Sequence, residues 1–343
     1  MESFESFLKK VPHIEETKNY WFLRTMRGHL FSPFLRSSII AIDYANIDEE
    51  NANSLIKGKL NEAKIKFIQS KYPDHKKPSI IVNNLKRFYS EMKIGDYVVI
   101  PDIPDIAERS IAVGEIISEI EYIEGIEMFR PSGKAYIDRE YQRSRKVKWL
   151  ALAKKNNFSP YLYGLLNSHL TISKANAYSE WIDGLMFNFY KKNEQYHYII
   201  NIKQRYGLSA KTVYGAFYEL LNLADEFLRE ERIDESVDSI DTKIALRSPG
   251  FIELLGMAGT AITIICFLIL FINGGGFKYK KKDGTEISLS TDGVIKRLNE
   301  FLNSRKDRII KSELAVKIKS LKIENTDDIV DILNTVNEKN QNE

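Results

Sequence analysis

Short apolar runs alternate with longer segments of helical spacing over the first 150 residues. Four apolar runs have the β-branched and aromatic composition of strands and are bounded by Gly, Pro or Asp. These predicted strands are Tyr20–Thr25, Ile39–Tyr44, Tyr97–Pro101 and Ile111–Ile123. A fifth, Val147–Leu150, follows a basic run. Ala52–Tyr72 and Ser79–Met92 repeat apolar residues near the helical period and are predicted helices. Short strands with few helices indicate a small curled sheet or barrel rather than a doubly wound sheet.

Residues 151–248 are predicted to form a second α+β domain that links the first to the rest of the chain. Leu185–Tyr190 and Tyr196–Lys203 have strand composition on either side of a polar stretch and indicate a hairpin. The amphipathic segment Ala210–Glu230 predicts a long helix, and Ser209 is placed to be its N-cap.

An uncharged apolar segment, Leu254–Ile272, has about the length that a helix needs to cross the hydrocarbon core of a bilayer. A helix that is apolar on every side is typical of a membrane span, and a central buried helix in an oligomer is the alternative. We therefore predict a single transmembrane helix over residues 251–273 in the inner (cytoplasmic) membrane, with the N-terminal domains in the cytoplasm. Residues 274–343 are predicted to be mostly helical. The helices expected there are Thr291–Asn303, Lys311–Leu321 and Thr326–Thr335.

Small and polar residues gather on one side of the apolar segment when it is drawn as a helix. This face contains Glu253, Gly256, Gly259, Thr260, Thr263 and Phe267. Small residues let helices approach closely in lipid, and threonine hydroxyls form hydrogen bonds across such contacts. Two interpretations stay open: the face lines a pore within a ring of helices, or it packs two protomers together. Both predict a homo-oligomer surrounded by membrane lipid.

Composition narrows the candidate chemistry. A net charge of +3 and a pI near 8.5 are too mild to indicate a nucleic-acid partner, so such a partner must be argued from local patches. The lone Cys266 excludes an intrachain disulfide and a cysteine-based zinc site, and the five histidines lack metal-ligand spacing. The N-terminus lacks the apolar core of a secretory signal. With no phosphate-binding glycine loop or nucleophile motif, we expect no enzyme activity, no metal and no cofactor.

Four segments in the first half of the chain resemble a known superfamily. They are NYWFLRT (19–25), KIGDYVVIPD (93–102), IAVGEIISEIEY (111–122) and RKVKWL (145–150). Their order is similar to the small barrel of the PUA/EVE-like superfamily, especially the N-terminal modules of Mrr- and McrB-type modification-dependent restriction proteins. The resemblance covers residues 15–150 at most. It implies a β-barrel-like domain over residues 1–150 that binds an oligonucleotide, a nucleotide or a modified base, often against aromatic side chains.

Aromatic and basic side chains in this domain supply candidate contacts, because rings stack on bases and cations bind phosphates. The candidates are Trp21, Arg24, Arg27, Tyr44, Arg143, Arg145, Lys146, Lys148 and Trp149. Core packing of the tryptophans and a solvated strand edge for the basic run stay open as alternatives.

The succession of a sensor module, a linking domain and a self-associating helix resembles membrane effectors of bacterial anti-phage systems, including the transmembrane effector of the Hailong nucleotidyltransferase system. The leading hypothesis is therefore an oligomeric membrane effector of abortive infection. In it, an oligonucleotide or nucleotide made by a partner nucleotidyltransferase controls a pore or ion channel. The alternatives are a membrane-tethered nucleic-acid-binding adaptor without conduction and a soluble modification-dependent restriction component.

Overall fold

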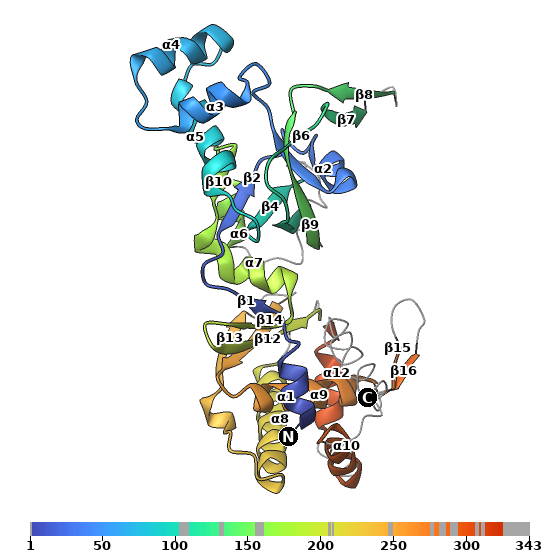
Figure 1. Cartoon of the computed structure of the whole chain (residues 1–343). Coiled ribbons are helices and arrows are strands. Elements are labelled where there is room, and N and C mark those ends of the chain that lie inside the picture. Colours follow the sequence, from blue (N-terminus) through green and yellow to red (C-terminus); the bar gives the residue numbers. More distant parts are fainter. Residues whose placement is uncertain are drawn as a thin grey trace. The chain divides into compact units, whose positions relative to one another are not determined.

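The chain is a mixed α/β protein made of two compact units (Figure 1). The computed structural model describes residues 2–102, 110–129, 134–154, 161–204, 207, 209–245, 250–274, 278–280, 286–288, 294–305, 309 and 313–324. One unit is Thr17–Met186, and the other joins Met1–Glu16 to Phe187–Glu343. These limits differ from the predicted boundaries at residues 150 and 248, and strand β9, Arg143–Lys154, continues through the first of them.

A half-barrel sheet forms the centre of the Thr17–Met186 unit. Its strand order is β10-β2-β4-β5-β9-β3, and β6 also pairs with β9. Besides β9, the strands are β2 (Tyr20–Leu23), β3 (Ile39–Ile42), β4 (Tyr97–Pro101), β5 (Ser110–Ile116), β6 (Glu121–Tyr122) and β10 (Ile172–Lys174). The first part of β9 pairs with β3 and β6, and the second part pairs with β5. This change of partner curls the sheet, and a bulge beside Gly114 increases the bend.

Helices and a separate hairpin complete this unit. The helices are α2 (Phe31–Ser37), α3 (Glu49–Ile56), α4 (Glu62–Lys71), α5 (Pro78–Lys86), α6 (Leu162–Leu166) and α7 (Ser179–Met186), with a π-helical turn η1 (Arg87–Glu91) and a 3-10 turn η3 (Asn176–Tyr178). The hairpin pairs β7 (Ile126–Phe129) with β8 (Ala135–Asp138). The single helix predicted over Ala52–Tyr72 is two helices, because Gly58 has a φ of +68° that an α-helix does not accept. Asp48 and Asn61 cap the two helices that result.

The other unit is a sheet with helices packed on it. Its strand order is β1-β11-β12-β14-β13, and β17 pairs with the end of β12. The strands are β1 (His13–Ile14), β11 (Phe189–Lys192), β12 (Gln195–Ile202), β13 (Asp241–Ala245), β14 (Gly250–Gly256) and β17 (Ile323–Glu324). The helices are α1 (Glu2–Leu8), α8 (Ala210–Glu230), α9 (Gly259–Gly274), α10 (Val294–Ser304) and α12 (Leu314–Ser320), with a 3-10 turn η4 (Val237–Ser239). A small hairpin joins β15 (Lys278–Lys280) to β16 (Glu286–Ser288).

This second unit contains the same succession of elements twice. The hairpin β11–β12 is followed by α8, and the hairpin β13–β14 is followed by α9. The two hairpins meet along β12 and β14, and α8, α9 and α12 pack side by side (Figure 1). The predicted helix Ala210–Glu230 is confirmed as α8, and its N-cap is confirmed because the Ser209 hydroxyl accepts a hydrogen bond from the Thr212 amide at 3.1 Å. The predicted helix over Thr326–Thr335 lies outside the described residues.

The apolar segment Leu254–Ile272 is not a single helix. Its first residues belong to β14, which lies between β12 and β13, and α9 begins only at Gly259. The side chains of α9 are buried against α1, α8 and α12. In the part of the chain that the structure describes, no helix combines the length and apolar character needed to cross a membrane. The transmembrane helix over residues 251–273, the fold class that included it and the single-pass membrane localisation are therefore wrong predictions.

Close packing inside the unit accounts for two glycines of the predicted pore or packing face. A Cβ atom on Gly256 would lie 2.7 Å from the carbonyl oxygen of Ser239. A Cβ atom on Gly259 would lie 2.6 Å from the ring of Tyr196. Both glycines are therefore required by neighbours within the same chain, whichever other contacts the segment makes.

The remaining helical members of that face also have partners in the same unit. The carboxylate of Glu235 accepts hydrogen bonds from the amides of Thr260, at 3.3 Å, and of the next residue, at 2.9 Å, and thereby satisfies the N-terminus of α9. The Thr263 hydroxyl donates to the carbonyl oxygen four residues earlier, at 2.8 Å. The ring of Phe267 packs edge-on against a phenylalanine of α1, with 5.4 Å between centroids. The face is an internal packing surface in this structure.

Candidate functional site

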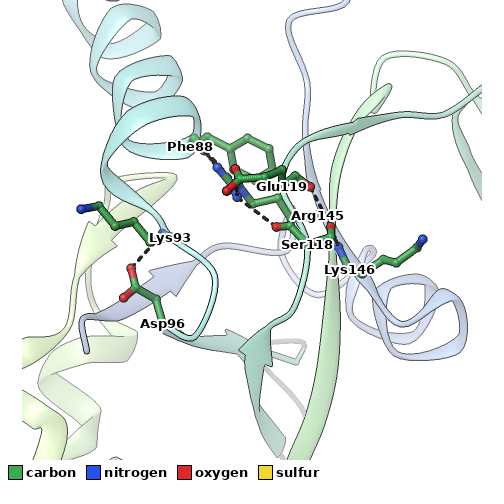
Figure 2. Close-up of polar contacts among 7 residues, drawn as sticks. All are labelled: Phe88, Lys93, Asp96, Ser118, Glu119, Arg145 and Lys146. Atoms are coloured by element: carbon green, nitrogen blue, oxygen red, sulfur yellow. Dashed lines mark hydrogen bonds and ion pairs between the residues drawn. The ribbon is translucent and has the colours of Figure 1, made fainter. Parts of the chain in front are cut away.

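Strand β9 places the members of the predicted basic run on opposite sides. Arg143 and Arg145 are 2% and 1% exposed, whereas Lys146 and Lys148 are exposed. Figure 2 shows the guanidinium of Arg145 directed at the end of the helix that precedes β4. Its Nε and Nη2 atoms donate to the carbonyl oxygen of Phe88 at 3.1 and 3.0 Å. The two arginines are therefore structural side chains, and the two lysines alone face solvent.

Arg145 completes the end of the π-helical turn η1. The Lys93 amide, which follows this turn, donates instead to Asp96 Oδ2 at 3.0 Å (Figure 2). The guanidinium of Arg145 supplies the donors for Phe88, and a cation is favoured at the carboxyl end of a helix. Burial lowers the pKa of Arg145, and the nearby Glu119 carboxylate opposes this shift. π-helical turns are frequent near functional sites.

Of three further predicted contacts, the side chains of Trp21 and Arg24 form hydrogen bonds with other described residues and that of Trp149 does not. Trp21 is fully buried, and its Nε1 donates to Asp96 Oδ2 at 2.8 Å, so its ring does not face a ligand in this structure. The guanidinium of Arg24 donates to the carbonyl oxygen of Ser168 at 3.1 Å. Trp149 is partly exposed, and its Nε1 is buried without a hydrogen-bond partner among the described residues.

The structure brings a different group of residues together where β3 ends. Asp43 and Tyr44 directly follow β3. Ile42 at the end of β3 pairs with Arg143 of β9, and Tyr122 of β6 also pairs with Arg143. The positive φ of Tyr44, +86°, turns the chain sharply at this point. Strand register, rather than closeness in sequence, thus assembles the site.

We name this group the tyrosine–Asp43 cluster. Its members are Asp43, Tyr44, Tyr72, Tyr89, Tyr122, Tyr141 and Arg143. The rings of Tyr44 and Tyr72 meet edge-on with 5.8 Å between centroids. The hydroxyls of Tyr89 and Tyr122 lie 2.8 Å apart. The cluster therefore combines aromatic faces with phenol groups from five separate segments of the chain.

Arg143 connects several of these segments by hydrogen bonds. Its Nε donates to the Tyr89 hydroxyl at 2.6 Å, and its Nη1 donates to the carbonyl oxygen of Tyr44 at 2.8 Å. Burial raises the pKa of Tyr72 to about 12 and also raises the pKa of Tyr44, Tyr89 and Tyr141. The phenols are therefore protonated at neutral pH and are able to donate hydrogen bonds.

Asp43 is the acidic group of the cluster. Burial raises its pKa to about 6, and the carboxylates of Glu140 and Asp138 add to the rise, while its own backbone amide and His75 act in the opposite direction. Among the described residues, no lysine or arginine forms an ion pair with Asp43. A partly buried carboxyl group whose pKa is raised by burial and by neighbouring carboxylates is a candidate for a functional site.

Two polar atoms beside the cluster have no partner among the described residues: His75 Nδ1 and Asn84 Oδ1, both buried. The other side-chain atom of Asn84, Nδ2, donates to the Tyr44 hydroxyl at 2.9 Å. Buried polar groups are usually paired, so both atoms require a partner that the described residues do not supply, such as an ordered water. No group of three side chains suited to a metal ion occurs in the described segments.

A second buried polar group lies in the other unit and includes Glu253, the residue predicted at the mouth of a pore. Its Oε1 atom lies 2.7 Å from Nδ1 of His197, and its Oε2 atom lies 3.9 Å from Nζ of Lys243. The ring of Tyr190 stacks on His197 with 4.7 Å between centroids. Glu253 is thus paired within the sheet, which offsets the cost of burying its charge.

The sequence predicted only Tyr44 and Arg143 among the members of the cluster. It did not predict Asp43, Tyr72 or Tyr141 as ligand contacts. One local signal was present, because Asp43 and Tyr44 are polar residues at the end of an apolar strand. Their convergence with Tyr141 depends on the pairing of β3 with β9, which a single sequence does not reveal.

The comparisons with known proteins agree with the limits of this unit. Residues 23–174 match the family model of a domain of unknown function (DUF8426). The matched range includes every member of the tyrosine–Asp43 cluster and ends at the last residue of β10. Neither the curated proteins nor the solved structures include a match. The resemblance to PUA/EVE-like barrels stays a prediction.

Proposed function

We propose that the Thr17–Met186 unit binds a nucleotide or a single nucleic-acid strand by holding one base in the tyrosine–Asp43 cluster. The observation that carries the proposal is the carboxyl of Asp43, which is partly buried, acts electrostatically on Tyr44, Tyr72 and Tyr141, and has no ion pair among the described residues. Tyrosine rings stack on bases with about 1–3 kcal/mol per base. A carboxylate accepts hydrogen bonds from the amino groups on base edges.

This chemistry predicts a preference among bases. Cytosine, adenine and guanine present an amino donor to the Asp43 carboxylate, and each can stack on a tyrosine. Uracil and thymine present carbonyl oxygens on both sides of a single N–H, and those oxygens are repelled by a carboxylate. We therefore expect amino-bearing bases to bind more tightly than uracil or thymine at pH 7 and above, where Asp43 is ionised.

The pore and the membrane tether depended on the transmembrane helix and are not part of this proposal. What remains of the earlier hypotheses is recognition of an oligonucleotide or a free nucleotide. A nucleotide made by a partner nucleotidyltransferase and a strand of nucleic acid would present the same base to the cluster. Binding measurements with both kinds of probe distinguish these sources.

The test measures binding of the full chain to fluorescein-labelled homopolymer strands of cytosine, adenine and thymine, and to the free 5′-monophosphates as competitors. We expect binding to the cytosine or adenine probe, weaker binding to thymine, and a loss of about tenfold or more in Asp43→Asn and Tyr72→Ala, on the scale of one hydrogen bond or one stacked ring. Asp48→Asn is the matched control, because Asp48 follows the same strand and instead caps α3.

Two results would contradict the proposal. One is the absence of binding to every probe by the wild-type chain at millimolar nucleotide. The other is binding by Asp43→Asn and Tyr72→Ala that equals the wild type with the same order of bases. Displacement of a labelled strand by a free monophosphate, with equal affinity per base, would identify a nucleotide rather than a polymer as the ligand.

A further inference from the structure

The segment Thr25–Leu30 between β2 and α2 is a left-handed turn. Met26, Arg27 and Gly28 have φ values of +50°, +55° and +89°. Non-glycine residues seldom adopt this conformation, and each costs about 1–3 kcal/mol unless the surrounding structure holds it. Two such residues in succession show that the turn is held in place by its neighbours.

Hydrogen bonds fix both ends of this turn. The hydroxyl of Thr25 donates to the carbonyl oxygen of Pro101 in β4. The carbonyl oxygen of Thr25 accepts from the amide of Leu30 at 3.0 Å, which closes the turn. The guanidinium of Arg24, immediately before the turn, is bound to Ser168 as described above. Hydrogen bonds within the unit therefore hold the backbone conformation of the turn.

The centre of the turn offers donors that the protein does not use. In the hydrogen bonds among the described residues, the amides of Met26, Arg27 and Gly28 have no acceptor. Backbone amides in folded proteins nearly always have an acceptor, so these three donors are available for a ligand or for water. The side chain of Arg27 is exposed and forms no ion pair within the described segments. Adjacent free amides next to an arginine are the chemistry of an anion site.

The turn borders the tyrosine–Asp43 cluster. The hydroxyl of Tyr141 donates to Sδ of Met26 at 3.6 Å, so one side chain joins the two features. The cluster itself disfavours a phosphate, because it contains the carboxyl of Asp43 and the carboxylates of Asp138 and Glu140 act on the same place. The turn contains no acidic residue and carries Arg27 and a histidine. A nucleotide bound at the cluster would thus find its nearest favourable place for a phosphate at the turn.

We propose that the Thr25–Leu30 turn binds a phosphate of the ligand whose base lies in the tyrosine–Asp43 cluster, with Arg27 as the ionic partner and the Arg27 and Gly28 amides as donors. This inference rests on the proposed function. It divides recognition between two neighbouring places: an acidic, aromatic one for the base and a basic, amide-rich one for the phosphate. The contact is independent of base identity, because a phosphate carries no sequence information.

The test compares calorimetric titration of the full chain with the nucleosides and with their 5′-monophosphates. We expect each monophosphate to bind about tenfold more tightly than its nucleoside, which is the scale of a hydrogen bond to a charged group. In Arg27→Gln this difference should shrink severalfold while the affinity for the nucleoside is unchanged, and Arg27→Lys should retain part of it. Arg36→Gln, an exposed arginine on α2, is the matched control.

Two further measurements separate this contact from a general effect of charge. For an oligonucleotide probe, Arg27→Gln should lower the slope of log K against log salt by about 0.7, the value for one phosphate on a single strand. The ¹⁵N-labelled amides of Arg27 and Gly28 should shift with a monophosphate and stay in place with its nucleoside.

The outcomes distinguish the two proposals. If nucleosides bind but a phosphate adds no affinity, or if Arg27→Gln behaves like the wild type, the phosphate site is wrong and the base site stands. If neither nucleosides nor monophosphates bind, the proposed function is wrong and the phosphate site falls with it. Tryptophan fluorescence during heating shows whether each variant is folded, because the three tryptophans all lie in the Thr17–Met186 unit.

Discussion

Replacing Asp43 by asparagine should stabilise the Thr17–Met186 unit at neutral pH, because it removes a carboxyl whose ionised form is disfavoured by burial. The rise of its pKa from 3.8 to about 6 corresponds to about 3 kcal/mol as an upper bound. Asp43 is partly exposed, so solvent reduces the effect below this bound, to about 1–2 kcal/mol. Asparagine has the same shape and does not titrate.

The sign of the pH dependence follows from linkage. The pKa of Asp43 is higher in the folded than in the unfolded chain, so the folded chain binds more protons between pH 3.8 and about 6. The contribution of Asp43 to stability is complete below pH 3.8 and is lost as the pH rises to about 6. The free energy of unfolding of Asp43→Asn should therefore exceed that of the wild type most at pH 7–8 and least near pH 4.

Urea unfolding followed by tryptophan fluorescence measures this difference, since all three tryptophans lie in the unit that contains Asp43. Asp48→Asn is the control. Hydrogen bonds from Asn51 lower the pKa of the exposed Asp48, so its stabilisation is lost as the pH falls and its variant should show no gain at high pH. A gap between Asp43→Asn and the wild type that is constant from pH 4 to 8, or a destabilised Asp43→Asn at pH 8, would refute the reasoning. Asp43→Asn should also lose base binding. A gain in stability together with a loss of binding is expected where a residue is kept for function at a cost in stability.

Three substitutions test the packing described above. Gly259→Ala should lower the free energy of unfolding by about 1–3 kcal/mol, because the new methyl group overlaps the ring of Tyr196; an unchanged melting curve by circular dichroism would contradict the close contact. Gly215→Ala in α8 should raise it by about 0.5–1 kcal/mol in the same assay, because the methyl group meets only ordinary contacts and alanine favours a helix; a loss of stability would show that the site is tighter than it appears. Arg145→Lys should lower the free energy of unfolding by about 2 kcal/mol, because lysine cannot donate two hydrogen bonds to the carbonyl oxygen of Phe88 as the guanidinium does. Urea unfolding followed by tryptophan fluorescence measures this, and an unchanged midpoint would show that Arg145 does not stabilise the end of this helix.

Elements whose pattern is local were predicted well. The range Ala210–Glu230 coincides with α8, because one strong apolar stripe and one serine cap define it without help from the rest of the chain. The range Tyr97–Pro101 coincides with β4, because turn residues bound a short β-branched run. Ile111–Ile123 was predicted as one strand, but β5 ends at Ile116 and β6 is a separate, two-residue strand.

The apolar segment shows why continuous hydrophobicity is ambiguous. A strand buried on both faces and a helix buried all round both appear as unbroken apolar runs. β14 and α9 are such elements in direct succession, and together they have the length of a membrane span. The residues that separate them, Met257 and Ala258, carry no charge or proline that would mark a boundary. Only the pairing of β14 with both neighbours distinguishes the two descriptions.

The burial of the predicted binding residues also could not be predicted from the local sequence. Alternation along β9 implies that Arg145 and Lys146 face opposite ways, but it does not say which of them is inside. The arginine is inside because a helix end supplies carbonyl oxygens that match its guanidinium. That helix end is distant in sequence, so neither the burial of Arg145 nor the exposure of Lys146 was predictable from their own neighbourhood.

The unit that joins Met1–Glu16 to Phe187–Glu343 is built from two segments that are synthesised at different times. A chain leaves the ribosome from its N-terminus, and domains generally fold as they are completed. Strand β1 pairs in parallel with β11, and Phe7 of α1 packs on Phe267, so both early segments emerge long before their partners. The whole Thr17–Met186 unit is synthesised in the interval. The pairing of β1 with β11 must therefore wait until the whole Thr17–Met186 unit has been synthesised.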